Sequence, residues 1–174
     1  LRKIPDNVPN QDMLKKYLNQ SLTCVPDPFG KFGSFGEHNN SMLKVFLDTF
    51  NFKYDFKSAT DLYKSGFFND QLKNVLLNHD KIKNIVLPTL GEERRKTYSP
   101  FLPICSETKQ VLEVEVLKTN IKNSSIIYKN INNEEVEVSV LDGNCKLQWK
   151  VDWAMRWIAF CLLYTSPSPR DSDS

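Results

Sequence analysis

The chain has 174 residues, 40% of them hydrophobic and 25% charged, which suits one globular domain or one domain with a small insertion. Its net charge of +2 is too small to identify a nucleic-acid partner. No apolar run approaches the roughly 20 residues of a membrane-spanning helix, and no signal-peptide pattern occurs. We therefore expect a cytoplasmic protein with no membrane partner.

The N-terminal part is expected to hold two helices separated by a glycine-rich loop. Asn10 can cap the first helix. Gly30, Gly33 and Gly36 allow close backbone approach or positive φ in residues 26–36. The alternative is that these residues form only a surface turn. The second helix opens near Glu37. Apolar residues at helical spacing predict the buried face of each helix: Met13, Leu14, Tyr17 and Leu18 in the first, Met42, Leu43, Phe46, Leu47 and Phe50 in the second.

Strand and helix patterns then alternate. Residues 53–57 alternate as a strand, Ser58 can cap a short helix that Gly66 ends, a helical pattern runs from Leu72 to Ile82, and residues 85–87 read as a short buried strand. This order predicts an α/β fold with a parallel sheet.

From Phe101 the pattern becomes β-rich. Runs at 111–116, 125–131 and 136–140 are each followed by a hairpin signal: Asn123-Ser124, Asn132-Asn133 and Asp142-Gly143. We expect a small antiparallel insertion here. Such a unit could also bind nucleic acid, although its low aromatic content, essentially Tyr128, gives little surface for base stacking.

All three tryptophans fall in residues 145–157, CKLQWKVDWAMRW. Leu147, Trp149 and Val151 alternate as a strand, whereas Trp153 and Trp157 are four apart, as on a helix. The sequence predicts a strand running into a helix, with Asp152 at the junction, where ligands dock in open α/β sheets. The alternative is that the tryptophans are core residues and the charges a solvated face.

The chain resembles the catalytic domain of class I lysyl-tRNA synthetase, closest to the alphaproteobacterial type. The resemblance rests on residues 27–30 (DPFG), 34–40 (SFGEHNN), 88–104 (PTLGEERRKTYSPFLPI) and the tryptophan segment, and runs from Leu1 to about Phe160. It implies a partial Rossmann-like domain in residues 1–100 and 146–160, interrupted by a β-rich connective insertion at 101–145. It also implies ATP with Mg²⁺, lysine and tRNA(Lys) as substrates and partners of the parent enzyme.

The resemblance directs attention to particular side chains. Trp149 and Trp153 would form the walls of a lysine pocket, because aromatic faces suit both the ammonium and the methylenes of a lysine side chain. Asp152 would be a polar contact or an orienting residue, and Arg156 would fix its carboxylate. Contacts to phosphate or to the tRNA end are candidates at three further residues, each of which could instead be a capping or solvated residue: His38, Arg94 and Arg95.

Zinc is not expected. Many members of this family carry an insertion that opens with Cys-x-x-Cys, but here Cys105 is followed by Thr108, and only Cys145 could join it in a tetrahedral site. Together with Cys24 and Cys161 they show no paired spacing, so free thiols are the simplest reading.

Residues 161–174 resemble a translated sequencing adapter and are excluded from fold reasoning. The His-x-Gly-His-like and Lys-Met-Ser-Lys-Ser-like signatures that handle phosphate in such enzymes do not occur in this chain, so we expect no catalytic residue in it and no activity from it alone. The alternative function is a non-catalytic RNA- or nucleotide-binding module.

Overall fold

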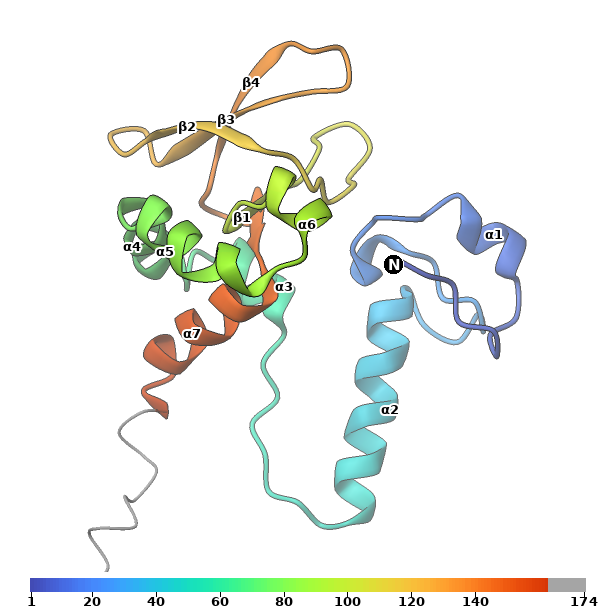
Figure 1. The fold of residues 1–174 in the computed structure, drawn as a ribbon. Coiled ribbons are helices and arrows are strands. Elements are labelled where there is room, and N and C mark those ends of the chain that lie inside the picture. Colours follow the sequence, from blue (N-terminus) through green and yellow to red (C-terminus); the bar gives the residue numbers. More distant parts are fainter. Residues whose placement is uncertain (163–174) are drawn as a thin grey trace, which may run out of the picture. The chain divides into compact units, whose positions relative to one another are not determined.

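The computed structural model describes residues 1–162, and most of the expected adapter-derived tail lies outside this range. The chain divides into two compact units (Figure 1). Unit 1 comprises residues 1–61 and 104–112, and unit 2 comprises residues 62–103 together with the chain from 113 onward. Among the described residues, no helix is long and apolar enough to cross a membrane.

Unit 1 contains α1 (Gln11–Lys15), the 3-10 helix η1 (Leu22–Cys24) and α2 (Phe35–Thr49). Asn10 does not cap α1 as expected: its side chain donates instead to the carbonyl of Pro28, at 2.8 Å. Residues 104–112 join this unit through the antiparallel bridge between Gln20 and Gln110 and a hydrogen bond from Val111 N to Asn19 O. Its small core consists of Leu14, Val25 and Phe35.

Asp27 organises the glycine-rich loop of unit 1. Its buried carboxylate accepts backbone N–H groups from Phe29 at 3.1 Å, Lys31 at 2.8 Å and Phe32 at 3.0 Å, and lies 3.1 Å from Nδ1 of His38. Burial by itself raises the pKa of this carboxyl, but the hydrogen bonds outweigh it and lower the pKa to about 2. The loop is therefore built around one anion.

The apolar face of α2 is exposed, which contradicts the prediction that it is buried. Ser34 caps the helix by accepting from Glu37 N, and the helix is amphipathic as expected. No described element covers that face, however, so its large side chains remain in solvent. More than 45% of each of the following is exposed: Met42, Leu43, Phe46 and Phe50, whereas Leu47 is partly buried.

The helices of unit 2 follow one another closely along the chain. The amide of Asp61 donates to Ser58 Oγ at 3.3 Å, so Ser58 caps the short helix as expected. Residues 53–57, predicted as a strand, are irregular, since no other segment pairs with them. α3 (Ala59–Lys64) begins at the end of unit 1 and continues into unit 2, which also contains α4 (Asn69–Leu77), α5 (His79–Val86), the 3-10 helix η2 (Leu87–Thr89) and α6 (Glu92–Thr97).

The prediction of a strand at 85–87 is also wrong. Ile85 and Val86 finish α5, and Leu87 begins η2. Both residues follow Ile82 at the three- and four-residue spacing of a helix, and a short apolar run does not distinguish a buried strand from a helix end.

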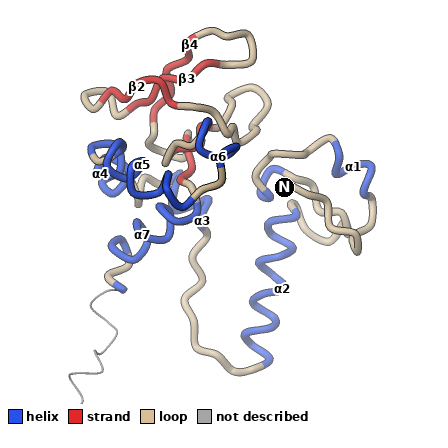
Figure 2. Tube along the Cα trace, viewed as in Figure 1, coloured by secondary structure: helices blue, strands red, loops and turns tan. Residues whose placement is uncertain are grey.

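The strands form two small antiparallel sheets, shown in Figure 2. β1 (Phe101–Pro103) pairs with β5 (Cys145–Leu147), and β2 (Val116–Asn120), β3 (Ser125–Lys129) and β4 (Glu135–Ser139) form a meander. The last two strands confirm the hairpin predicted between 125 and 140. Of the expected run at 111–116, only Val116 lies in a strand. The described residues thus form a mixed α/β structure, and no parallel Rossmann sheet occurs among them.

The core of unit 2 links its helices to both sheets. In Figure 1 the β2–β3–β4 sheet and α7 (Trp149–Ala159) lie at opposite ends of this unit, with β1 and helices α4 to α6 between them. The buried side chains come from α3, α4, α7, strands of both sheets and the adjoining loops: Tyr63, Phe68, Leu72, Val75, Leu76, Phe101, Val116, Ile126, Val140, Cys145, Leu147, Val151 and Met155.

Acid should destabilise unit 1 through Asp27. Because the folded pKa is below the ordinary value of 3.8, this carboxylate contributes stability above about pH 4, and the contribution is lost as the pH falls toward 2. We expect the protection of the Phe29, Lys31 and Phe32 amides, measured by hydrogen exchange, to fall in that window. Asp27→Asn should reduce this protection at neutral pH and remove its dependence between pH 4 and 2; an unchanged profile would contradict the anchoring role.

Removal of the Phe68 ring should destabilise unit 2. Its side chain is 0% exposed, so Phe68→Ala should cost about 3–5 kcal/mol in urea unfolding. Tryptophan fluorescence can follow the transition, because all three tryptophans lie on α7. Phe67→Ala is the matched control, since the neighbouring ring is 47% exposed and should cost clearly less. Equal losses would show that the core is elsewhere.

Candidate functional site

Helix α7 carries all three tryptophans on one side and leaves them in solvent. Trp149, Trp153 and Trp157 are spaced four residues apart and are 71%, 46% and 46% exposed. The rings of Trp149 and Trp153 meet edge to face, with centroids 6.2 Å apart and planes at 69°. Two large indoles therefore form an open aromatic corner near the start of the helix, which the interpretation as core residues does not explain.

The predicted strand-to-helix transition exists, but it comes earlier than expected. β5 ends at Leu147 and α7 begins at Trp149, so Trp149 is helical and the expected strand alternation through Val151 is wrong. Gln148 forms the junction instead of Asp152: its backbone N–H donates to Pro100 O at 2.8 Å, and its carbonyl accepts from Asp152 N. The four-residue helical spacing of Trp153 and Trp157 therefore continues one turn earlier, to Trp149.

The opposite side of α7 is buried. Val151 and Met155, also four residues apart, are 6% and 3% exposed and belong to the core of unit 2. Successive residues of an α-helix are rotated by about 100°, so Asp152 and Arg156 lie on the flank between the buried side and the tryptophans. A polar pair therefore separates the core from the aromatic corner.

Asp152 has a partner on each carboxylate oxygen. Its Oδ1 accepts from the Tyr63 hydroxyl at 2.6 Å, and its Oδ2 lies 2.7 Å from Nε of Arg156 in an ion pair whose N–H is not aligned for a hydrogen bond. Only 15% of the Asp152 side chain is exposed. Burial, and then the adjacent carboxylate, raise the pKa of Tyr63, so its hydroxyl stays protonated and can donate at neutral pH.

Sequence reasoning did not find Tyr63. It lies in α3, 89 residues before Asp152, and no local spacing connects the two. The one available signal was that a tyrosine in an apolar environment needs a partner for its hydroxyl.

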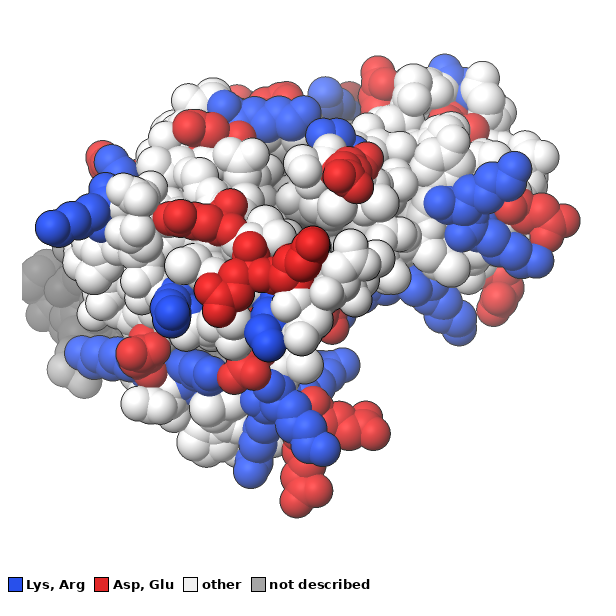
Figure 3. Space-filling view, turned by 90° about the horizontal axis from the view of Figure 1, so that it is seen from above, with Lys and Arg blue, Asp and Glu red and all other residues white. Residues whose placement is uncertain are grey.

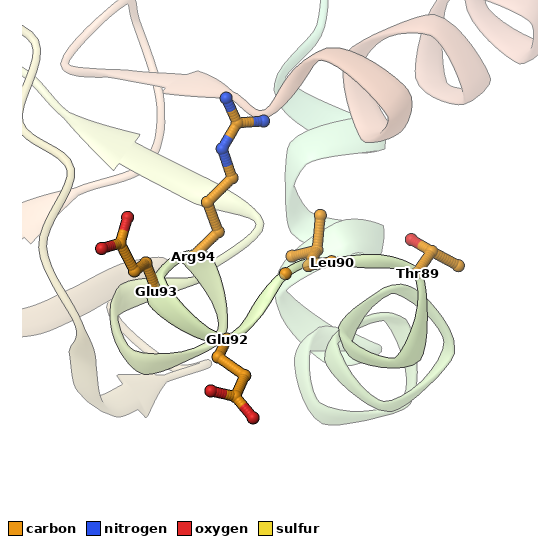
Figure 4. A pocket seen from close by; sticks show the side chains of 6 residues that line it. Thr89, Leu90, Glu92, Glu93 and Arg94 are labelled. Atoms are coloured by element: carbon orange, nitrogen blue, oxygen red, sulfur yellow. The ribbon is translucent and has the colours of Figure 1, made fainter.

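An open hollow adjoins this part of unit 2. It is lined by residues 89–94, between η2 and α6, and Figure 4 shows Glu92, Glu93 and Arg94 extending in different directions around it. Lys150 of α7 donates to Thr89 Oγ1 at 3.1 Å, which ties the rim of the hollow to the first turn of α7. Two carboxylates and a guanidinium thus lie near the helix that carries the indoles.

The two arginine candidates differ. Arg95 is engaged by its own loop, because Nε donates to Leu90 O at 2.7 Å and Nη2 to Pro88 O at 3.4 Å. Arg94 is exposed, and its guanidinium extends away from Glu92 and Glu93 in Figure 4. Of the two, Arg94 has the side chain that is available to an external anion.

His38 belongs to unit 1 and is enclosed. It is 8% exposed, stacks on Phe29 at a centroid distance of 4.5 Å and meets the edge of Phe32 at 5.4 Å, while Nδ1 faces Asp27. In this position the imidazole supports the glycine-rich loop. A contact of His38 with phosphate or tRNA stays a prediction.

Within residues 1–162, no three His, Cys, Asp or Glu side chains gather as metal ligands. Cys145 is buried, its Sγ lies 3.4 Å from Ser139 O, and burial raises the pKa of its thiol to about 12. A hydrogen bond from the Thr108 side chain is the main cause that lowers the pKa of Cys105. Thr108, at the position where the family resemblance places a second cysteine, therefore interacts with the first thiol.

Surface charge gives no strong preference for a polyanion on the face shown in Figure 3. Lys and Arg side chains there are interspersed with Asp and Glu, in agreement with the overall charge of +2. The chemistry that the α7 region offers is instead local: aromatic faces that attract a cation, with apolar surface beside them.

Comparison with known proteins places this arrangement in a family. The family described as class I tRNA synthetases (K) matches residues 1–165. The lysine–tRNA ligase of Rickettsia bellii (strain OSU 85-389) is 48% identical over 164 residues, those of Rickettsia felis and Rickettsia prowazekii are 47% and 46% identical, and the match covers 94% of this chain in each case. The chain spans 31% of the length of these curated relatives. The resemblance drawn from the motifs is confirmed, and the chain belongs to the class I tRNA synthetases of the lysine type.

Proposed function

We propose that this chain forms the lysine-recognition part of a lysine–tRNA ligase. The parent enzyme would join lysine to the α-phosphate of ATP, releasing pyrophosphate, and then transfer the lysyl group to the ribose at the end of tRNA(Lys). The observation that carries the proposal is the solvent-exposed corner of Trp149 and Trp153 on a helix anchored to the core, in a chain whose relatives are named lysine–tRNA ligases.

A lysine side chain is complementary to such a corner. Its ammonium is attracted to the face of an indole, and its four methylenes bury apolar surface against the same rings. Trp149 and Trp153 supply two ring systems at a steep angle, so a ligand can touch one by its face and the other by its edge. An uncharged side chain of similar length lacks the attraction between a cation and the indole face, so the corner would bind it more weakly.

ATP would be bound largely by parts of the parent enzyme outside this chain. Mg²⁺ would neutralise charge on the phosphates there, and the described residues offer no cluster of ligands that fits such an ion. This chain would contribute Arg94 at the rim of the hollow as a contact for the tRNA acceptor end. Residues 101–145 would serve as the connective insertion between 1–100 and 146–160, in a cytoplasmic enzyme.

Removal of the first indole should weaken lysine recognition. We define the full-length chimera as the Rickettsia bellii ligase whose matching segment is replaced by residues 1–160 of this chain. In that chimera, Trp149→Ala should raise KM for lysine on the order of tenfold, as expected for one cation–π contact with its apolar area, and leave KM for ATP nearly unchanged. ATP–pyrophosphate exchange at varied lysine and varied ATP measures both constants.

Trp157→Ala is the matched control, because Trp157 is as exposed as Trp153 and lies two turns after Trp149. It should change KM for lysine much less. Equal effects of the two substitutions, or a rise in KM for ATP alone, would contradict a lysine pocket at the aromatic corner.

By itself, this chain should not catalyse lysine-dependent ATP–pyrophosphate exchange, because its sequence contains neither phosphate-handling signature of the family. The assay needs the chimera as its positive control. Exchange by residues 1–160 above the background without lysine would overturn this expectation. Steeply salt-dependent RNA binding by the same chain would instead favour the alternative, a non-catalytic RNA-binding module.

A further inference from the structure

Four side chains of unit 2 form a closed ring of contacts beneath the aromatic corner. The Tyr63 hydroxyl donates to Asp152, Asp152 pairs with Arg156, and the Arg156 guanidinium lies 5.9 Å from the centroid of Phe68. Phe68 in turn meets Tyr63 edge to face at 5.1 Å. Two members come from α7, one from α3, and Phe68 immediately precedes α4.

Both oxygens of Asp152 are therefore occupied by protein groups, and its side chain is mostly buried. Each oxygen could accept a second hydrogen bond, but only 15% of the side chain is exposed, so little of the carboxylate is open to a ligand ammonium. Of the two roles that the sequence left open for Asp152, direct polar contact or orientation, the geometry favours orientation.

Tyr63 is the member that fixes the ring to the rest of the unit. Its hydroxyl donates to Asp152 in the first turn of α7 and also accepts the N–H of Leu147, the last residue of β5, at 3.4 Å. One oxygen thus joins the end of the strand to the start of the helix on either side of Gln148. Rotation of α7 about its axis would break the bond to Asp152 and redirect the indoles at the same time.

We propose that Tyr63 is a positioning residue for lysine, which sets the rotation of α7 and thereby the direction of the Trp149–Trp153 corner. This inference rests on the proposed function, since it assigns the corner to lysine. It assigns Tyr63 no contact with substrate.

Tyr63→Phe removes one oxygen and keeps the ring that packs on Phe68. In the chain itself, the substitution should increase acrylamide quenching of tryptophan fluorescence and shift the indole N–H resonances of Trp149 and Trp153. In the full-length chimera it should raise KM for lysine on the order of tenfold, the equivalent of one hydrogen bond to a charged group, with kcat and KM for ATP changed far less. Asp152→Asn, which can still accept from Tyr63, should give a smaller effect.

Tyr98→Phe is the matched control. Tyr98 is a buried tyrosine of the same unit, and its hydroxyl has no hydrogen-bond partner among the described residues. Its removal should leave the indole signals and KM for lysine as they are. Thermal unfolding of all variants identifies any effect that is only a loss of folded protein.

The outcomes separate the two proposals. Unchanged indole signals in Tyr63→Phe would overturn the positioning role, whatever the enzyme does. Shifted indoles with an unchanged KM for lysine would also overturn it, and Trp149→Ala then shows what has failed. If Trp149→Ala still raises KM for lysine, the lysine site stands without Tyr63; if it does not, the proposed function fails as well.

Discussion

The Asp152 carboxylate is the group on which the arrangement of α7 depends. Hydrophobic burial of Val151 and Met155 holds one side of the helix against unit 2, but burial is non-directional and tolerates small rotations. The hydrogen bond from Tyr63 to Oδ1 is directional, and Arg156 pairs with the second carboxylate oxygen, Oδ2. Together they select one orientation, in which the indoles leave the core and face solvent. Exposed tryptophans carry a cost in apolar surface left in water, and a binding role gives that cost a reason.

A comparable use of one buried anion occurs in unit 1. Asp27 accepts three backbone N–H groups and faces the His38 ring, and so gives shape to the glycine-rich loop. Next to this ordered loop, α2 leaves a row of large apolar side chains uncovered. The two features differ in how they are satisfied. Backbone N–H groups of the loop have a partner within unit 1, whereas no described residue covers the apolar face of α2.

Local patterns in the sequence predicted what depends on near neighbours. The four-residue spacing of Trp153 and Trp157 identified a helix, and the Asn132-Asn133 signal identified the hairpin between β3 and β4. Failures came where a pattern suits two structures or where tertiary packing decides. Ile85 fits a helix end as well as a strand, and the amphipathic α2 has an apolar face that the described chain does not cover. The role of Tyr63 could not be predicted from local patterns, because its partner Asp152 is 89 residues away and only the fold brings the two together.

The family was readable from the motifs because they are long, whereas residue roles depend on geometry, which the motifs do not contain. The central claim is that the corner of Trp149 and Trp153 receives the lysine side chain. The most direct measurement is a titration of the full-length chimera with L-lysine, followed through the indole N–H resonances of α7, with norleucine as the ligand that keeps the chain length but lacks the ammonium. The account predicts that lysine shifts the Trp149 and Trp153 signals, moves Trp157 little, and acts far below the concentration at which norleucine does. Shifts confined to Trp157, or equal responses to both amino acids, would contradict it.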